Sequence, residues 1–167
     1  TDFMYVGLVS AGNSLTITNG GQVIGNSYAY VGNGSAANGN TVLISGSNSL
    51  WKLNSTFLVG NLGNNNQATV SGTGRLQNVT GYVGLSGTNN VMLVTGAGTT
   101  WSNTSSLYVG YSGANNQLTI ADGARVDAFD FHMGGLYYDN TSTNGFNNLV
   151  TVTGPGSLLN VSDPTFA

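Results

Sequence analysis

Short apolar segments alternate with glycine- and asparagine-rich corners along the whole chain. The first recurring segment is a large residue, then Val or Met, then Gly: Tyr5-Val6-Gly7, Tyr30-Val31-Gly32, Leu58-Val59-Gly60, Tyr82-Val83-Gly84, Tyr108-Val109-Gly110 and His132-Met133-Gly134. Successive Val or Met positions are separated by 25, 28, 24, 26 and 24 residues. A repeat of this length predicts a stack of similar structural units.

An asparagine opens a second segment, in which apolar residues stand two and four positions later, as Leu15 and Ile17 follow Asn13. The six asparagines are Asn13, Asn40, Asn66, Asn90, Asn116 and Asn148. Six residues after each of them stands Asn, Gly or Asp, types that tolerate a left-handed backbone and therefore indicate a turn. Ten residues after each asparagine we place a third segment, at Val23, Leu50, Leu76, Thr100, Val126 and Leu158.

Each unit therefore holds three short strands, which need neighbours because an isolated short strand is not stable. A propeller blade would need four antiparallel strands and a period of about 40 residues or more. The shorter period predicts an all-β fold, a right-handed parallel β-solenoid (β-helix) with about six three-stranded coils of 24–28 residues. We expect one domain over residues 1–167, with an insertion at about 135–147 in the last coil, where Met133 and Asn148 are 15 residues apart.

Stacking of such coils aligns equivalent side chains into columns about 4.8 Å apart. The six asparagines are expected to form a structural ladder of amide hydrogen bonds. If Val6 and its equivalents point inward, the preceding residues point outward in an aromatic column of Tyr5, Tyr30, Tyr82 and Tyr108, together with Leu58 and His132. Such a column could stack on sugar rings or on another solenoid, or its rings could simply cover the sheet. Trp51 and Trp101 are expected to form a second, smaller apolar patch.

The middle strand presents Thr and Ser on its outer side, for example Thr16, Thr18 and Thr69. A regular threonine array would suit an ice-binding surface. Leu43, Leu93 and Ala121 interrupt this array, and threonine is in any case a common strand residue.

Charged residues make up only 5 % of the chain, with three Lys and Arg, six Asp and no Glu. A net charge of −3 with dispersed cations excludes a nucleic-acid footprint, which needs clustered basic residues. The absence of cysteine excludes disulfides and thiolate metal sites. No run of 18 apolar residues occurs, so we expect no membrane span.

The only charged neighbourhood surrounds Asp127 and Asp130, with Asp139 in the loop that follows, and these three carboxylates are a secondary candidate for a calcium site. A polysaccharide lyase or hydrolase would need further carboxylates on adjacent coils. The coil equivalents of Asp127 are taken to be Trp101 and Leu159, which supply none. The single histidine, His132, is interpreted as a packing variant of tyrosine. We therefore expect no enzyme, no catalytic residue and no cofactor.

Several segments resemble the passenger-associated repeats of bacterial autotransporters and related surface proteins. They are Thr99-Thr100-Trp101-Ser102-Asn103, Leu107-Tyr108-Val109-Gly110 and Gln117-Leu118-Thr119-Ile120. The resemblance implies a right-handed β-helix that is secreted or displayed on the bacterial cell surface as a stalk, adhesin or fibre.

These observations lead to a structural or adhesive extracellular protein. It is expected either to stack head to tail as the homo-oligomeric subunit of a filament or to be a segment of a longer passenger. Surface glycans or other cells are the expected partners. The alternative is a carbohydrate-binding module that uses the tyrosine column.

Overall fold

The computed structural model describes residues 3–135 and 145–163, which form three parallel β-sheets of six strands each. Sheet A contains β1 (Met4–Val6), β4 (Ala29–Val31), β7 (Phe57–Val59), β10 (Gly81–Val83), β13 (Leu107–Val109) and β16 (Phe131–Met133). Sheet B contains β2 (Ser14–Thr18), β5 (Thr41–Ser45), β8 (Gln67–Ser71), β11 (Val91–Thr95), β14 (Gln117–Ala121) and β17 (Leu149–Thr153). Sheet C contains β3 (Gln22–Gly25), β6 (Leu50–Leu53), β9 (Arg75–Asn78), β12 (Thr100–Asn103), β15 (Arg125–Ala128) and β18 (Leu158–Val161).

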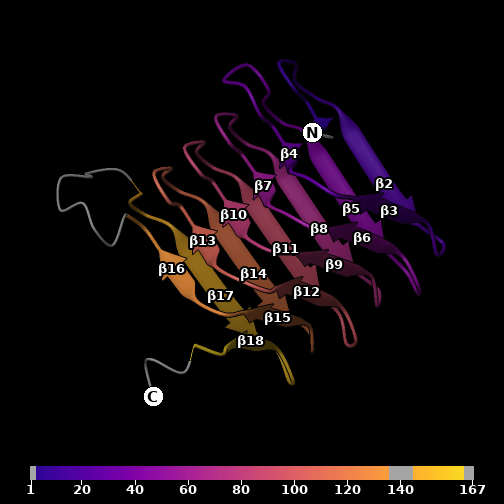
Figure 1. The fold of residues 1–167 in the computed structure, drawn as a ribbon. Helices are drawn as coiled ribbons and strands as arrows, with labels where there is room; N and C mark the ends of the chain where they lie inside the picture. Colours follow the sequence, from indigo (N-terminus) through magenta and orange to yellow (C-terminus); the bar gives the residue numbers. More distant parts are fainter. Residues whose placement is uncertain (1–2, 136–144, 164–167) are drawn as a thin grey trace.

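The chain winds as a β-solenoid in which each coil gives one strand to each sheet (Figure 1). Coil 1 is β1–β3, and the coils are numbered along the chain to coil 6, which is β16–β18. About five full turns separate Val6 from Met133. The all-β solenoid fold with three strands per coil is confirmed. Its right-handed sense remains the expectation for parallel crossover connections.

Adjacent coils pair residue for residue, and this register builds the core. Coil 1 meets coil 2 at three positions in sheet A, five in sheet B and four in sheet C. The first recurring segment supplies an inward row of buried valines, namely Val6, Val31, Val59, Val83 and Val109. Rows from the other sheets face them, so burial of apolar area holds together strands that would not be stable alone.

In sheet C the inward row differs from the sequence expectation by one residue in every second coil. The row is Val23, Trp51, Leu76, Trp101, Val126 and Leu159. The expected Leu50, Thr100 and Leu158 each precede the inward residue. A shift of one residue moves a strand side chain to the opposite face of the sheet.

The cause is a turn between sheets B and C that alternates in length. Coil 1 has a three-residue turn over 19–21, whereas coil 2 has a four-residue turn over 46–49. Each four-residue turn ends in a hydroxyl that accepts a hydrogen bond from the coil before it. Gly20 N–H donates to Ser49 Oγ (3.1 Å), Thr73 N–H to Thr99 Oγ1 (3.0 Å) and Gly123 N–H to Ser157 Oγ (3.0 Å). The structural repeat is therefore a pair of coils.

Both tryptophans lie in the core at 0 % exposure and form no surface patch, contrary to the sequence expectation. Trp51 packs edge-on against Phe57, with ring centroids 5.2 Å apart. The indole N–H of Trp101 donates to Asn78 Oδ1 at 2.7 Å. The indole N–H of Trp51 is buried without a partner among the described residues, because Gly25 occupies the coil position equivalent to Asn78.

This difference predicts unequal effects of one substitution. Trp101→Phe should lower the free energy of unfolding by about 1–3 kcal/mol more than Trp51→Phe, because only Trp101→Phe leaves a buried acceptor, Asn78 Oδ1, without its donor. Urea unfolding followed by circular dichroism measures both variants. Equal losses would show that the Trp101 hydrogen bond has no net effect.

The expected insertion falls mainly on residues 136–144, which lie outside the described residues. Its two ends meet at the corner between sheets A and B, since a β-carbon on Gly134 would lie 2.7 Å from the carbonyl oxygen of Gly145. Across the described residues, no helix has the length and apolar character needed to cross a membrane.

Candidate functional site

The six repeated asparagines form a continuous ladder along the corner that precedes sheet B. In each step, one Oδ1 accepts both the backbone N–H and the side-chain amide of the asparagine one coil earlier. Asn40 and Asn66 show the pattern, with a backbone-to-Oδ1 distance of 2.9 Å and an amide-to-Oδ1 distance of 2.9 Å. The same pair of bonds links Asn13 to Asn40, Asn66 to Asn90, Asn90 to Asn116 and Asn116 to Asn148.

Glycines of the first recurring segment provide the space for this ladder. Gly84 has a φ of +76°, and a β-carbon built there would overlap the side-chain amide of Asn116 in the next coil. Gly7, Gly32, Gly60 and Gly110 bear the same relation to Asn40, Asn66, Asn90 and Asn148. Each glycine is therefore required both by its backbone conformation and by the asparagine packed against it.

The outer side of sheet A carries two aromatic groups instead of one column. The N-terminal aromatic cluster consists of Phe3, Tyr5, Tyr28 and Tyr30, with ring centroids 5.2–6.3 Å apart. Tyr5 and Tyr30 stack at 5.2 Å and 13°. Phe3, Tyr5 and Tyr28 are 44 %, 38 % and 40 % exposed, so this cluster offers ring surface to solvent.

The second aromatic group covers the sheet more closely. Tyr82, Tyr108 and His132 stack in line at 4.8 and 4.9 Å, and Tyr111 lies edge-on to both tyrosines. Burial, and to a smaller extent the phenols of Tyr108, Tyr111 and Tyr28, raise the pKa of Tyr82 to about 12. Leu58, expected in an exposed column, is only 3 % exposed and separates the two groups.

Phe3, Tyr28 and Tyr111 were not identified from the sequence as members of these groups. They lie outside the three residues of the first recurring segment, so the repeat pattern gave no signal for them. Phe3 and Tyr28 lie two residues before Tyr5 and Tyr30, so alternation along the chain places their rings on the same face, and Tyr111 lies in the bend that follows β13.

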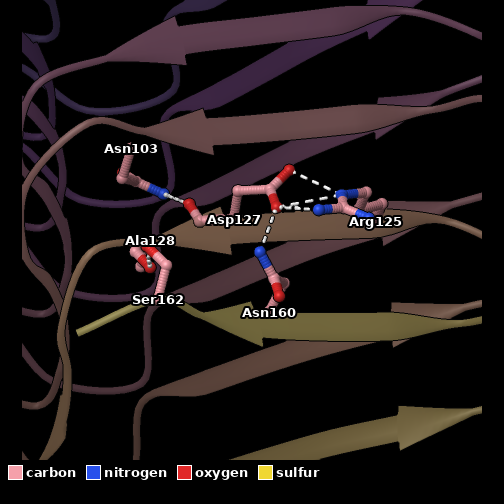
Figure 2. A network of polar contacts seen from close by, with 6 residues as sticks. All are labelled: Asn103, Arg125, Asp127, Ala128, Asn160 and Ser162. Atoms are coloured by element: carbon pink, nitrogen blue, oxygen red, sulfur yellow. Dashed lines mark hydrogen bonds and ion pairs between the residues drawn. The ribbon is translucent and has the colours of Figure 1, made fainter. Parts of the chain in front are cut away.

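A polar network occupies the outer side of sheet C around Asp127 (Figure 2). Its carboxylate accepts two bonds from Arg125 Nε, at 2.9 and 2.8 Å, one from Arg125 Nη2 at 2.6 Å and one from Asn160 Nδ2 at 2.9 Å. The Asn103 amide donates to the backbone carbonyl of Asp127 at 3.1 Å. The coil equivalents of Asp127 are Ser102 and Asn160, not Trp101 and Leu159 as the sequence suggested.

Of the three expected carboxylates, the structure describes Asp127 and Asp130, which have different partners. Asp127 is paired with Arg125. The Oδ1 atom of Asp130 is buried at 3.7 Å from His132 Nε2, too far for a hydrogen bond. Asp139 lies outside the described residues. Within the part of the chain that the structure describes, no three His, Cys, Asp or Glu side chains are grouped to hold a metal ion.

The Asp127 network predicts a small loss of stability in acid. The hydrogen bond from Arg125 holds the pKa of Asp127 below its ordinary value. A depressed folded-state pKa stabilises the protein above the unfolded-state value and is lost as the pH falls through the folded-state value. As the pH falls from 5 to 2, we expect Asp127→Asn to lose less unfolding free energy than the unchanged chain. The difference between the two losses should be at most about 1 kcal/mol, because Asp127 and Arg125 are both partly exposed.

Urea titrations at each pH measure this difference. Asp122→Asn is the control for loss of a carboxylate elsewhere on the solenoid. A larger acid loss in Asp127→Asn would contradict the assignment of the lowered pKa to the Arg125 contact.

An open groove of about 430 Å³ follows the corner between sheets C and A in coils 2 to 4. Lys52, Gln77 and Ser102 line it from the sheet, and Asn54, Val79 and Thr104 line it from the corner. On sheet B, the threonine array is in register but is interrupted by Leu43 and Leu93, as the sequence suggested. Neither surface brings together an acid, a base and a nucleophile among the described residues.

No protein-family model, no curated protein and no solved structure matches this chain.

Proposed function

We propose that this chain is a structural and adhesive element that works outside the cell, as a stiff spacer with a repetitive lateral surface. The single observation that carries the proposal is the uninterrupted register of three parallel sheets, reinforced by the buried asparagine ladder. Every coil pairs its three strands with those of its neighbours in the same three sheets. Such an arrangement favours a role as a stiff spacer over a role that depends on one localised active site.

The surface supports the adhesive part of the proposal. Charged residues are 5 % of the chain, so the outside is built mainly of Asn, Ser, Thr and Gly with exposed rings. The similarity of the repeated segments to autotransporter passengers suggests placement on a bacterial surface. We propose no catalytic role and no bound cofactor.

Bead adhesion tests this function. Beads coated with the chain are expected to be retained on at least one surface from a panel of immobilised polysaccharides and cultured host cells. Beads coated with an uncharged protein of similar size are the control for passive sticking. Retention no greater than the control on every surface, or turnover of any polysaccharide in the panel, would overturn the proposal.

Carbohydrate binding is a second candidate, favoured by the N-terminal aromatic cluster. Sugar rings present apolar faces that stack on exposed aromatic side chains. Tyr5→Ser with Tyr28→Ser is expected to abolish retention on a polysaccharide surface. Tyr82→Ser with Tyr108→Ser is the matched control, because Tyr111 and the stack itself cover those rings. Equal retention by both variants would exclude the cluster as the site.

A further inference from the structure

We propose that two copies of this chain associate head to tail, with coil 6 of one copy pairing against coil 1 of the next in the register that joins coils within the chain. The inference rests on the proposed structural function and specifies its partner as a second copy. The two coils lie at opposite ends of the solenoid, β2 and β3 at one end and β16–β18 at the other (Figure 1).

The described strands at both ends lack charged residues and proline, two features that commonly prevent edge pairing. Edge strands of natural proteins are commonly protected by lysine, other charges or proline. None of β1, β2, β3, β16, β17 and β18 contains a charged residue or a proline. Coil 6 instead exposes apolar side chains, including Met133, Leu149 and Val152.

The inward rows of the two coils match in chemistry. Continuing the internal register places Val150 of coil 6 against Leu15, Val152 against Ile17 and Leu159 against Val23 of the second copy. All six side chains are apolar. Pairing of coil 6 with coil 1 of the second copy is called the joint below. It would bury the apolar residues at the ends of the two cores, as pairing between adjacent coils does within the chain.

The asparagine ladder is complementary across the same joint. Each internal Oδ1 accepts from the asparagine one coil earlier, and Asn13 Oδ1 accepts from none of the described residues. Asn148 stands at the donor end of the ladder. Gly134 has a φ of +71°, like the other glycines of the first recurring segment, but the carbonyl oxygen of Gly145 lies against it, 2.7 Å from the position of an added β-carbon. Asn13 of a second copy would extend the ladder by accepting hydrogen bonds from Asn148.

The alternation of three- and four-residue turns would also continue across the joint. Within the chain, the first residue of a turn can donate to the coil after it, as Gly46 N–H does to the Ser71 carbonyl (3.3 Å), Gly96 N–H to the Ala121 carbonyl (3.1 Å) and, from a three-residue turn, Asp122 N–H to the Thr153 carbonyl (3.2 Å). Coil 6 has a four-residue turn that begins at Gly154, and coil 1 has a three-residue turn. Gly154 N–H would therefore donate to the Thr18 carbonyl of the second copy, and the alternation would continue without a mismatch.

Engineered cysteines test the joint, because the chain has none of its own. Thr16 and Thr151 belong to one outward column, so the joint places their Cα atoms about 4.8 Å apart, within disulfide range. Chains with Thr16→Cys mixed with chains with Thr151→Cys should give a disulfide-linked dimer on mild oxidation. Mixtures of Thr18→Cys and Thr151→Cys should not, because those Cα atoms would be roughly 8 Å apart.

A charge at the joint provides an independent measurement. Val152→Lys should shift the sedimenting species from assemblies to monomer, whereas Val79→Lys on the lateral corner should leave assemblies unchanged. Circular dichroism checks that both variants fold. Monomeric wild-type chain at all concentrations, or equal crosslinking in both cysteine mixtures, would overturn the proposal. Bead adhesion of the Val152→Lys monomer separates this result from the adhesive function.

Discussion

Gly84→Ala is expected to lower the free energy of unfolding by at least about 3 kcal/mol and to be among the most damaging substitutions in the chain. Alanine at a φ of +76° is strained, which alone costs about 1–2 kcal/mol. The added methyl group would also overlap the buried amide of Asn116, which cannot move without breaking the ladder. Urea unfolding followed by circular dichroism measures the loss.

Gly39→Ala separates the two contributions. Gly39 also has a positive φ, +62°, but a β-carbon there would meet nothing within 4 Å. This variant should therefore lose only the backbone contribution. Equal losses in Gly39→Ala and Gly84→Ala would show that the asparagine does not restrict the glycine position.

Asn90→Ala is expected to cost about 3 kcal/mol or more in unfolding free energy. The substitution removes Asn90 Oδ1, which accepts the backbone N–H of Asn66 at 2.9 Å and its side-chain amide at 3.1 Å. Asn66 is fully buried, so both donors would be left without a partner, and each costs about 1–3 kcal/mol. Thermal and urea unfolding report the change.

Asn54→Ala is the matched control for this substitution. Asn54 donates to Asn26 Oδ1 at 3.0 Å across adjacent coils, but the pair is exposed to water. Its loss should cost less than about 1 kcal/mol, because water replaces the broken bond. A comparable loss from Asn54→Ala would mean that burial does not decide the strength of these amide contacts.

The period of the recurring segments was sufficient to predict the solenoid. Segments with one apolar face can be buried at this spacing only by coiling, so the parallel sheets and the valine row followed from the sequence. The turn between sheets B and C was not predictable in the same way. Its length alternates between three and four residues, and counting a fixed ten residues from each asparagine placed Leu50 and Thr100 inward.

That single-residue error explains the wrong prediction for the tryptophans. Side chains in a strand alternate between faces, so placing Leu50 and Thr100 inward necessarily placed Trp51 and Trp101 outward. The spacings of 25, 28, 24, 26 and 24 residues contain the alternation, since the coils with four-residue turns are the longer ones. Bulky tryptophan at matching places would have been a second signal for burial in a core.

The surface groups depended on residues that do not repeat. Phe3 and Tyr28 join Tyr5 and Tyr30 because residues two apart along a strand share a face, whereas Tyr111 reaches Tyr82 and Tyr108 from the bend after β13. The contact between the glycines of the first recurring segment and the ladder asparagines was also not predictable from the sequence. The two partners are separated by one coil plus a turn of variable length, so their contact has no fixed sequence spacing.

The alternating turns also determine how a molecule of this design can change in length. Deleting one coil would bring two turns of the same length into contact and remove a hydroxyl acceptor such as Thr99 Oγ1 from its donor. Deleting or duplicating two coils, such as the stretch from Val59 to Tyr108, would preserve the strand register and the alternation of turn lengths at the junction. Growth of such a gene by internal duplication should therefore proceed in steps of paired coils.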